Sequence, residues 1–250
     1  MARQIFLAAY LITVAGIGAL DAEENEVLIF SSGVRQVVLV ELFTSEGCNS
    51  CPPADGWFSS LQHKADLWSD FVPISFHVDY WDDIGWRDRF ATPEFSARQR
   101  RYADEGAANV VYTPGFFRNG REWRGWFLGS LLAASVSSVG NLSVHIEDDE
   151  VSAYFDPEHD FDEDLTIHVA LLGMDLESRV SAGENVGRTL RHDFVVINAT
   201  SVPLRKMGAA YTGKLGMPES RVRLERSAIV AWVSPRGRQM PIQATGGFLR

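Results

Sequence analysis

The chain has 250 residues, a formal net charge of −10 and 46% hydrophobic residues, which suits one large soluble domain or two small ones. The acidic balance and the lack of a long basic stretch argue against nucleic acids and anionic membrane surfaces as partners. Two cysteines are too few for a disulfide-dense scaffold. Any function they have therefore requires both of them.

The N-terminal segment 1–22 has the pattern of a secretory signal peptide. Arg3 precedes an apolar run over 5–20, and Ala19 and Ala22 are small residues at which cleavage would be possible. The alternative is an uncleaved membrane anchor, although the run is short for a spanning helix. We expect a secreted or periplasmic protein that has no membrane contact after cleavage. A disulfide is permitted in such a compartment.

The segment 34–139 alternates between strand and helix patterns. We expect the following elements: a buried strand at 37–43, a helix from Pro52, a strand at 71–79, a helix from Thr92 to Gly106, a hairpin at 110–126 that turns at Asn119-Gly120, and a short helix at 131–139. This order predicts an α/β fold in which helices cover a sheet.

Beyond residue 140 the pattern changes to strands separated by polar turns. Little helix is expected between these strands, which favours an antiparallel, sandwich-like β unit. The sequence thus predicts three segments: the signal peptide at 1–22, an α/β domain at 34–139 and the β unit at 140–250.

The pair Cys48–Cys51 lies between the first strand and the first helix. The N-terminus of a helix favours a thiolate, which is the nucleophilic form of cysteine, so Cys48 is the candidate attacking thiol. Cys51 lies in the first helical turn and would then resolve a mixed disulfide. Two alternatives remain open: a fixed structural disulfide and part of a metal site.

The segments "VVLVELFTSEGCNSCPP" and "VYTPG" resemble the thioredoxin superfamily, and "FTSEGC" is similar to glutaredoxins. The resemblance implies a thioredoxin-like fold for 34–139. It also implies a cis peptide bond between Thr113 and Pro114, beside the dithiol and facing the substrate. A longer set of motifs resembles a family of secreted bacterial proteins that have a thioredoxin-like domain and an unassigned function. Gly47 and the dipeptide Asn49-Ser50 depart from the usual thioredoxin pattern, so the direction of electron flow stays open.

Glu41 is the only charged residue in its apolar strand. The resemblance implies that it is a buried proton acceptor for Cys51, with a pKa raised by burial. The alternative is a carboxylate that reaches solvent or pairs with an arginine.

An aromatic loop follows the strand at 71–79 and contains Trp81 and Trp86. These rings could grip a substrate beside the dithiol, or the loop could simply bury its own aromatic side chains. His77 could hydrogen-bond locally, or it could bind copper or zinc together with Cys48 and Cys51. The polar loop 181–190 favours a plain turn cluster over a contact with the dithiol.

We therefore expect a secreted thiol-disulfide oxidoreductase-like protein that exchanges disulfides at Cys48 and Cys51, with Glu41 as proton acceptor. Thr113, Pro114, Trp81 and Trp86 would bind a protein or a small thiol or disulfide substrate. No organic cofactor is expected, because no phosphate-binding glycine motif follows a strand. The alternative is a non-catalytic binding module with a structural disulfide, and a less favoured one is a copper-handling protein.

Overall fold

The computed structural model describes residues 27–127 and 132–249. The predicted signal peptide at 1–22 lies outside the described residues. Within the described part of the chain, no helix is both long and apolar enough to cross a membrane.

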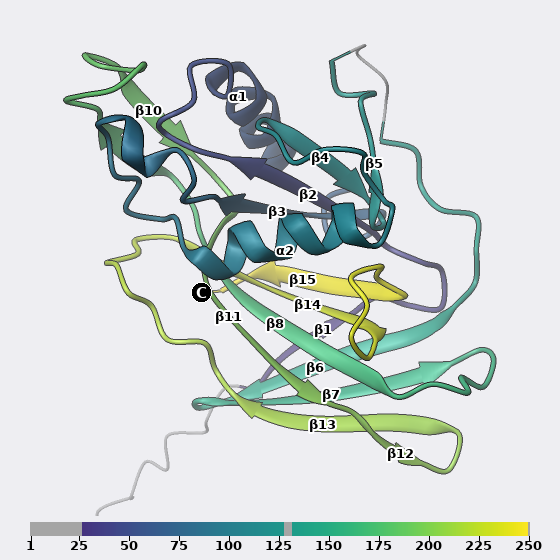
Figure 1. Cartoon of the computed structure of the whole chain (residues 1–250). Helices are drawn as coiled ribbons and strands as arrows, with labels where there is room; N and C mark the ends of the chain where they lie inside the picture. The colour runs from purple at the N-terminus through teal and green to yellow at the C-terminus, as the bar shows by residue number, and fades with distance from the viewer. Residues whose placement is uncertain (1–26, 128–131, 250) are drawn as a thin grey trace, which may run out of the picture.

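An eight-stranded sheet runs through the middle of the molecule (Figure 1). Its strands follow the spatial order β15-β14-β8-β11-β3-β2-β4-β5, and only the pairs β2–β3 and β3–β11 are parallel. In chain order the strands are β2 (Val38–Thr44), β3 (Phe71–His77), β4 (Gly115–Arg118), β5 (Arg121–Glu122), β8 (Leu165–Gly173), β11 (Val195–Pro203), β14 (Ser227–Pro235) and β15 (Gln243–Phe248).

The strand β2 and the helix after it position the two cysteines. Every residue of β2 is buried, as expected for a central strand covered on both faces. Helix α1 (Pro52–Ser60) follows with two prolines in its first turn, where their missing N–H groups cost no helical hydrogen bond. Helix α2 (Pro93–Asp104) begins similarly after Thr92, whose side chain accepts a hydrogen bond from the N–H of Phe95.

A five-stranded antiparallel sheet packs against the part of the large sheet that contains β8 and β14 (Figure 1). Its spatial order is β1-β6-β7-β13-β12, and its strands are β1 (Leu28–Ser31), β6 (Gly140–Glu147), β7 (Glu150–Pro157), β12 (Arg205–Met207) and β13 (Ala210–Gly216). Strand β8 contributes to two cores, because Ile167 and Val169 pack against this second sheet while Ala170 and Leu172 pack in the core with β2 and β3.

A two-stranded sheet and two short helices complete the fold. Strands β9 (Leu176–Arg179) and β10 (Thr189–His192) form a hairpin that lies beside α1 (Figure 1). The 3-10 helices η1 (Leu61–His63) and η2 (Asp82–Ile84) follow α1 and β3.

The fold class expected from the sequence, a thioredoxin-like α/β domain followed by a β unit, is wrong. The described residues form fifteen strands in three sheets and only two α-helices. No helix forms over 132–139, where one was predicted. That segment instead pairs with the chain ahead of β2, since Gln36 N donates to Ser137 O and Arg35 forms a β-bridge with Ser138.

The free edge of β3 explains why the sheet extends so far. Backbone groups at a buried edge need partners, and β11 supplies them. Ser75 N donates to Phe194 O at 2.8 Å, and Val195 stands in parallel register with Ser75. Strands from both sides of the predicted boundary at residue 140 therefore share one sheet.

The turn between β4 and β5 is the predicted Asn119-Gly120 turn, and it fixes the start of β2. Asn119 and Gly120 have φ values of 45° and 73°, and Asn119 Oδ1 accepts a hydrogen bond from Leu39 N at 2.8 Å. A Cβ added to Gly120 would lie 2.8 Å from Met240 Cα. The turn therefore needs glycine both for its backbone conformation and for this close approach.

We predict that Gly120→Ala lowers the free energy of unfolding by about 2–4 kcal/mol, because it combines left-handed strain with a backbone clash. Gly237→Ala is the matched control, since Gly237 has φ of 77° and no atom within 4 Å of an added Cβ. It should cost only about 1–2 kcal/mol, the cost of strain alone. Urea unfolding of both variants measures the difference, and equal losses would contradict the clash.

Candidate functional site

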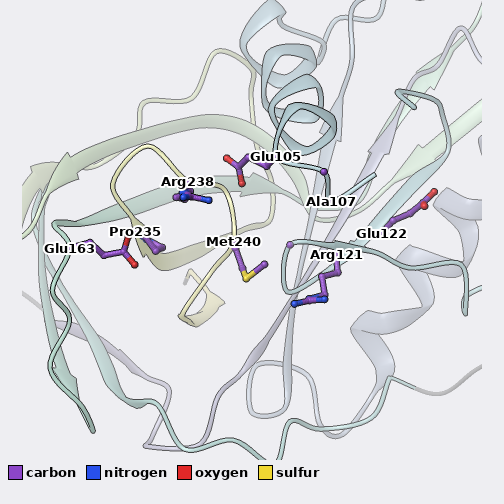
Figure 2. Close-up of a pocket in the computed structure, with 10 residues that line it drawn as sticks. Glu105, Ala107, Arg121, Glu122, Glu163, Pro235, Arg238 and Met240 are labelled. Atoms are coloured by element: carbon purple, nitrogen blue, oxygen red, sulfur yellow. The ribbon is translucent and has the colours of Figure 1, made fainter. Parts of the chain in front are cut away.

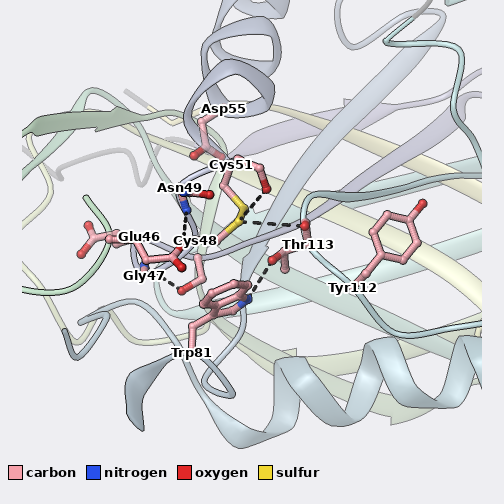
Figure 3. The surroundings of a disulfide bond; sticks show 12 residues. Glu46, Gly47, Cys48, Asn49, Cys51, Asp55, Trp81, Tyr112 and Thr113 are labelled. Carbon is pink, nitrogen blue, oxygen red and sulfur yellow. Dashed lines mark hydrogen bonds between the residues drawn. A yellow bond between two sulfur atoms is a disulfide. The ribbon is translucent and has the colours of Figure 1, made fainter. Parts of the chain in front are cut away.

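Cys48 and Cys51 form a disulfide at the junction of β2 and α1 (Figure 3). Cys51 caps α1, and its carbonyl accepts hydrogen bonds from Ala54 N and Asp55 N at 2.9 and 3.0 Å. Cys48 Sγ lies 3.2 Å from Ser50 Oγ. Both cysteines are 0% exposed. The predicted pair thus occupies the expected place, but solvent does not reach it in this conformation.

Thr113 and Pro114 lie beside the disulfide, and the peptide bond between them is cis, as the resemblance implied. Thr113 O is 3.9 Å from Cys48 Sγ, and Thr113 Oγ1 accepts a hydrogen bond from Trp81 Nε1 at 2.8 Å (Figure 3). We call the segment 45–51, between β2 and α1, the cysteine turn. A Cβ on Gly47 would lie 3.0 Å from Trp81 Cβ, so the Trp81 side chain packs directly against this turn.

Trp86 lies at a different part of the turn from Trp81. Its Nε1 donates to Glu46 Oε2 at 2.7 Å, and its Cβ approaches Gly183 of the β9–β10 hairpin. Of the predicted substrate-binding residues, the structure brings Trp81 together with Thr113, whereas Trp86 instead binds the residue two positions ahead of Cys48.

An apolar cavity of about 510 Å³ adjoins the cis peptide bond. It is lined by Val110, Tyr112, Pro114, Arg124, Trp126 and Phe127. A larger cavity of about 750 Å³ lies where the end of α2, the β4–β5 turn and the loop at 235–240 meet (Figure 2). Its lining mixes glutamates and arginines and includes neither the cysteines nor Pro114. Of these two cavities, the smaller one is therefore the one that reaches Pro114 of the cis peptide bond.

Glu41 is buried as expected, but it has a cationic partner. Arg98 of α2 lies 2.7 Å from Glu41 Oε1, and the Tyr102 hydroxyl donates to Glu41 Oε2. Of the two alternatives for Glu41, the structure therefore shows pairing with an arginine. Burial and the Glu41 carboxylate together raise the pKa of Tyr102 well above its ordinary value, so Tyr102 keeps its proton.

A cluster of five buried titratable side chains lies behind the cysteine turn. We call it the histidine-acid cluster; its members are Glu46, Asp55, His77, Asp88 and His192. They come from the turn before Cys48, α1, β3, the loop after η2 and β10. This clustering was not predicted, because its members are far apart in sequence and His192 joins the others through the pairing of β3 with β11.

Two histidines hold the cluster together. His77 Nδ1 lies 2.6 Å from Asp88 Oδ2. His192 lies between two acids, with Nε2 at 3.4 Å from Glu46 Oε1 and Nδ1 at 3.7 Å from Asp55 Oδ2. The two imidazole rings meet edge to face at 4.8 Å. The five side chains therefore form one continuous network.

The charges in this network are strongly coupled. Burial alone would lower the pKa of His77, but Asp88, with Asp55 and Glu46 beyond it, raises it to about 9. Burial would raise the pKa of Asp88, yet the adjacent His77 holds it below its ordinary value. Burial raises the pKa of Asp55 despite the attraction of His192. His77 is therefore cationic at neutral pH.

Several polar atoms of the cluster have no hydrogen-bond partner among the described residues: Glu46 Oε1, Asp55 Oδ2, His77 Nε2 and both ring nitrogens of His192. Even so, no group of three or more histidine, cysteine, aspartate or glutamate side chains within 27–127 and 132–249 is arranged so that it could hold a metal ion. His77, which we considered as a ligand with Cys48 and Cys51, binds Asp88 instead.

The loop of the β9–β10 hairpin contacts the cysteine turn directly. Asn185 is 1% exposed, and its Nδ2 donates to Glu46 O and to Cys48 O, both at 2.9 Å. Glu184 Oε2 accepts from Asn49 N at 3.1 Å. The loop 181–190 was interpreted as a plain turn cluster, but it holds three backbone groups of the cysteine turn. Its mixture of Gly, Asn and charge was the only sequence signal.

The His77–Asp88 pair predicts a pH dependence of stability. Because the pKa of His77 is about 9 in the folded protein and about 6.5 when unfolded, its contribution is complete below pH 6.5 and is lost as pH rises through 9. The unfolding free energy of the oxidised protein should fall by about 3 kcal/mol over this range. His77→Gln should remove the slope, while His63→Gln, at an exposed position, should keep it. Urea unfolding at several pH values checks this, and an unchanged slope in His77→Gln would contradict it.

Comparisons with known proteins place the chain in a family. None of the curated proteins matches it. Two solved structures are similar: protein AGR_C_4864 from Agrobacterium tumefaciens has 23% identity and a TM-score of 0.59 over 86% of this chain and 94% of that one. HBP35 of Porphyromonas gingivalis has 14% identity and a TM-score of 0.58 over 86% of this chain and 76% of that one. At such identities the likeness concerns the fold alone. Residues 39–234 match the family described as "Protein of unknown function (DUF1223)", and the chain belongs to that family.

Proposed function

We propose that this protein catalyses thiol-disulfide exchange through Cys48 and Cys51 in an oxidising compartment outside the cytoplasm. The observation that carries the proposal is the disulfide at the start of α1 with the Thr113 carbonyl 3.9 Å from Cys48 Sγ. The compartment is inferred from the predicted signal peptide. The apolar cavity beside Pro114 is of a size to accept a side chain of a peptide substrate.

The reaction needs only sulfur chemistry. In the reduced protein, the Cys48 thiolate attacks one sulfur of a substrate disulfide, the substrate S–S bond breaks, and the leaving thiolate takes up a proton. Cys51 then loses its proton and attacks Cys48 Sγ, which breaks the mixed disulfide and releases the second substrate thiolate, to which that proton passes. Two electrons and two protons move to the substrate, and the reverse sequence oxidises a dithiol.

Access to sulfur requires local movement. Both cysteines are fully buried, and Trp81 packs over the turn while it is tied to Thr113 by one hydrogen bond. Trp81 itself is only partly buried, and the loop that carries it contains the short helix η2. Such loops open at a small fraction of the global unfolding free energy. Displacement of Trp81 is the simplest route by which a substrate sulfur reaches Cys48.

The second candidate function is a binding module in which the disulfide is structural. One observation favours it: the complete burial of both cysteines, since reactive cysteines are generally partly accessible. The two candidates differ in redox potential, because structural disulfides lie below about −300 mV and exchange catalysts lie between about −120 and −270 mV.

The decisive experiment is equilibration of the protein with glutathione buffers, followed by alkylation of free thiols. We expect a potential in the catalyst range. A value below about −300 mV would reject exchange in favour of the structural disulfide.

A trapping experiment tests the roles of the two cysteines. With oxidised glutathione as the probe, Cys51→Ser should accumulate a mixed disulfide on Cys48, because the resolving thiol is missing. Cys48→Ser is the matched control and should form little adduct, since Cys51 is placed to attack Cys48 rather than an external sulfur. Mass spectrometry of the intact protein gives the readout, and equal labelling of both variants would contradict the assignment.

The proposed access route predicts the effect of removing Trp81. Trp81→Ala should speed reduction of the disulfide by dithiothreitol about tenfold or more, because the cover over Cys48 is lost. Trp86→Ala is the control. It also removes a tryptophan side chain, but one that contacts the turn at Glu46 rather than beside Thr113, so it should have a much smaller effect on the reduction rate. Reduction rates are followed by alkylation, with urea unfolding as a check on the fold. An unchanged rate in Trp81→Ala would show that access takes another route.

A further inference from the structure

The loop of the β9–β10 hairpin places a carboxylate on the cysteine turn. Glu184 Oε2 accepts a hydrogen bond from Asn49 N, the amide directly after Cys48. Beside it, Asn185 holds the carbonyls of Glu46 and Cys48, and Arg188 donates to Asn185 Oδ1 at 2.9 Å. Because Asn185 is buried and has three such contacts, Glu184 is held next to the turn rather than left free to move in solvent.

The bonded amide belongs to the residue directly after Cys48, two positions before the N-cap of α1 at Cys51. Glu184 therefore places a negative charge next to the residue that carries the attacking thiol. A nearby negative charge disfavours ionisation of a thiol, because it would repel the thiolate.

The surrounding charges do not cancel this effect. The titratable or charged side chains of the histidine-acid cluster and of the hairpin loop on the turn are Glu46, Asp55, His77, Asp88, Glu184, Arg188 and His192. Four are carboxylates, and the one permanent cation, Arg188, is bound to the Asn185 side chain. His77 compensates Asp88, its partner at 2.6 Å.

We propose that Glu184 is a positioning residue that disfavours the Cys48 thiolate and so biases the pair toward electron donation. A destabilised thiolate makes the reduced form less stable relative to the disulfide, which lowers the reduction potential. The substrate class is therefore a disulfide to be reduced, and the pair must be re-reduced by a dithiol donor. This direction rests on the proposed exchange function.

Glu184→Gln tests the charge and retains the contact, since the amide oxygen of glutamine can still accept from Asn49 N. The thiol pKa of Cys48 is measured from thiolate absorbance and from iodoacetamide rates against pH. We expect it to fall by about half a unit to one unit. At a pH above the Cys48 pKa, where the reduced protein carries the thiolate, the equilibrium constant for oxidation by glutathione disulfide should fall about three- to tenfold, because under that condition a tenfold change follows one pKa unit. Both shifts should shrink at high salt, since Glu184 is exposed.

Glu177→Gln is the matched control. It removes one carboxylate from the same hairpin, where Glu177 pairs with Arg191 at 3.4 Å, and it should leave the thiol pKa unchanged. The inference is overturned if Glu184→Gln raises the thiol pKa, leaves it unchanged, or shifts it no more than Glu177→Gln does.

Failure of the underlying function has a different signature. It would show as a missing glutathione adduct in Cys51→Ser, whereas the thiol pKa is measured without any disulfide exchange. An effect of Glu184→Gln on the thiol pKa, without any adduct in Cys51→Ser, would support the electrostatic role and reject exchange.

Discussion

The parallel pairing of β3 with β11 is the constraint on which the site depends. Ser75 N donates to Phe194 O, and this contact joins strands from the two halves of the chain in one sheet. Strand β10 ends two residues before Phe194, at His192. The pairing therefore carries His192 to His77 at the end of β3, and it brings the hairpin loop with Glu184 and Asn185 onto the cysteine turn. Phe194, with a φ of 59°, makes the sharp change of direction between β10 and β11.

The histidine-acid cluster follows from this geometry. Three carboxylates are buried behind the turn, and the side chains that lie against them are the imidazoles of His77 and His192. A buried carboxylate is costly unless it is paired, so His77 must stay protonated to balance Asp88. His192 has an acid facing each ring nitrogen, whereas a neutral imidazole can donate to only one of them. His192 therefore links the two ends of the cluster, with Glu46 on one side of its ring and Asp55 on the other.

The sequence predicted the part of the site that is local in the chain. A buried strand, a pair of cysteines and a proline-led helix are adjacent in sequence, and the structure places them as expected. The cis bond at Thr113–Pro114 was implied by resemblance, and the contact with Trp81 follows from two loops at the same sheet edge. Composition and spacing carry such short-range features well.

The parts that failed depend on contacts between distant residues. The partner of Glu41 is Arg98, which lies fifty-seven positions away on a helix whose buried face cannot be assigned from charge alone. The fold class failed because the segment at 132–139 pairs as extended chain and because β3 gains a neighbour from beyond residue 190. Hydrophobic patterns identify a strand but do not identify its neighbour.

The cysteine turn is subject to two opposed influences. Its position at the start of α1 favours a thiolate, as does the hydroxyl of Ser50 beside Cys48 Sγ. Glu184 on the Asn49 amide and Glu46 two residues before Cys48 oppose it. Dipole effects act over one helical turn and Glu184 is exposed to screening by salt, whereas the charge of the buried Glu46 is screened much less. Because one of the opposing groups, Glu184, belongs to a separate hairpin, the C-terminal half of the chain contributes to the environment of the pair together with the strand and helix that hold the cysteines.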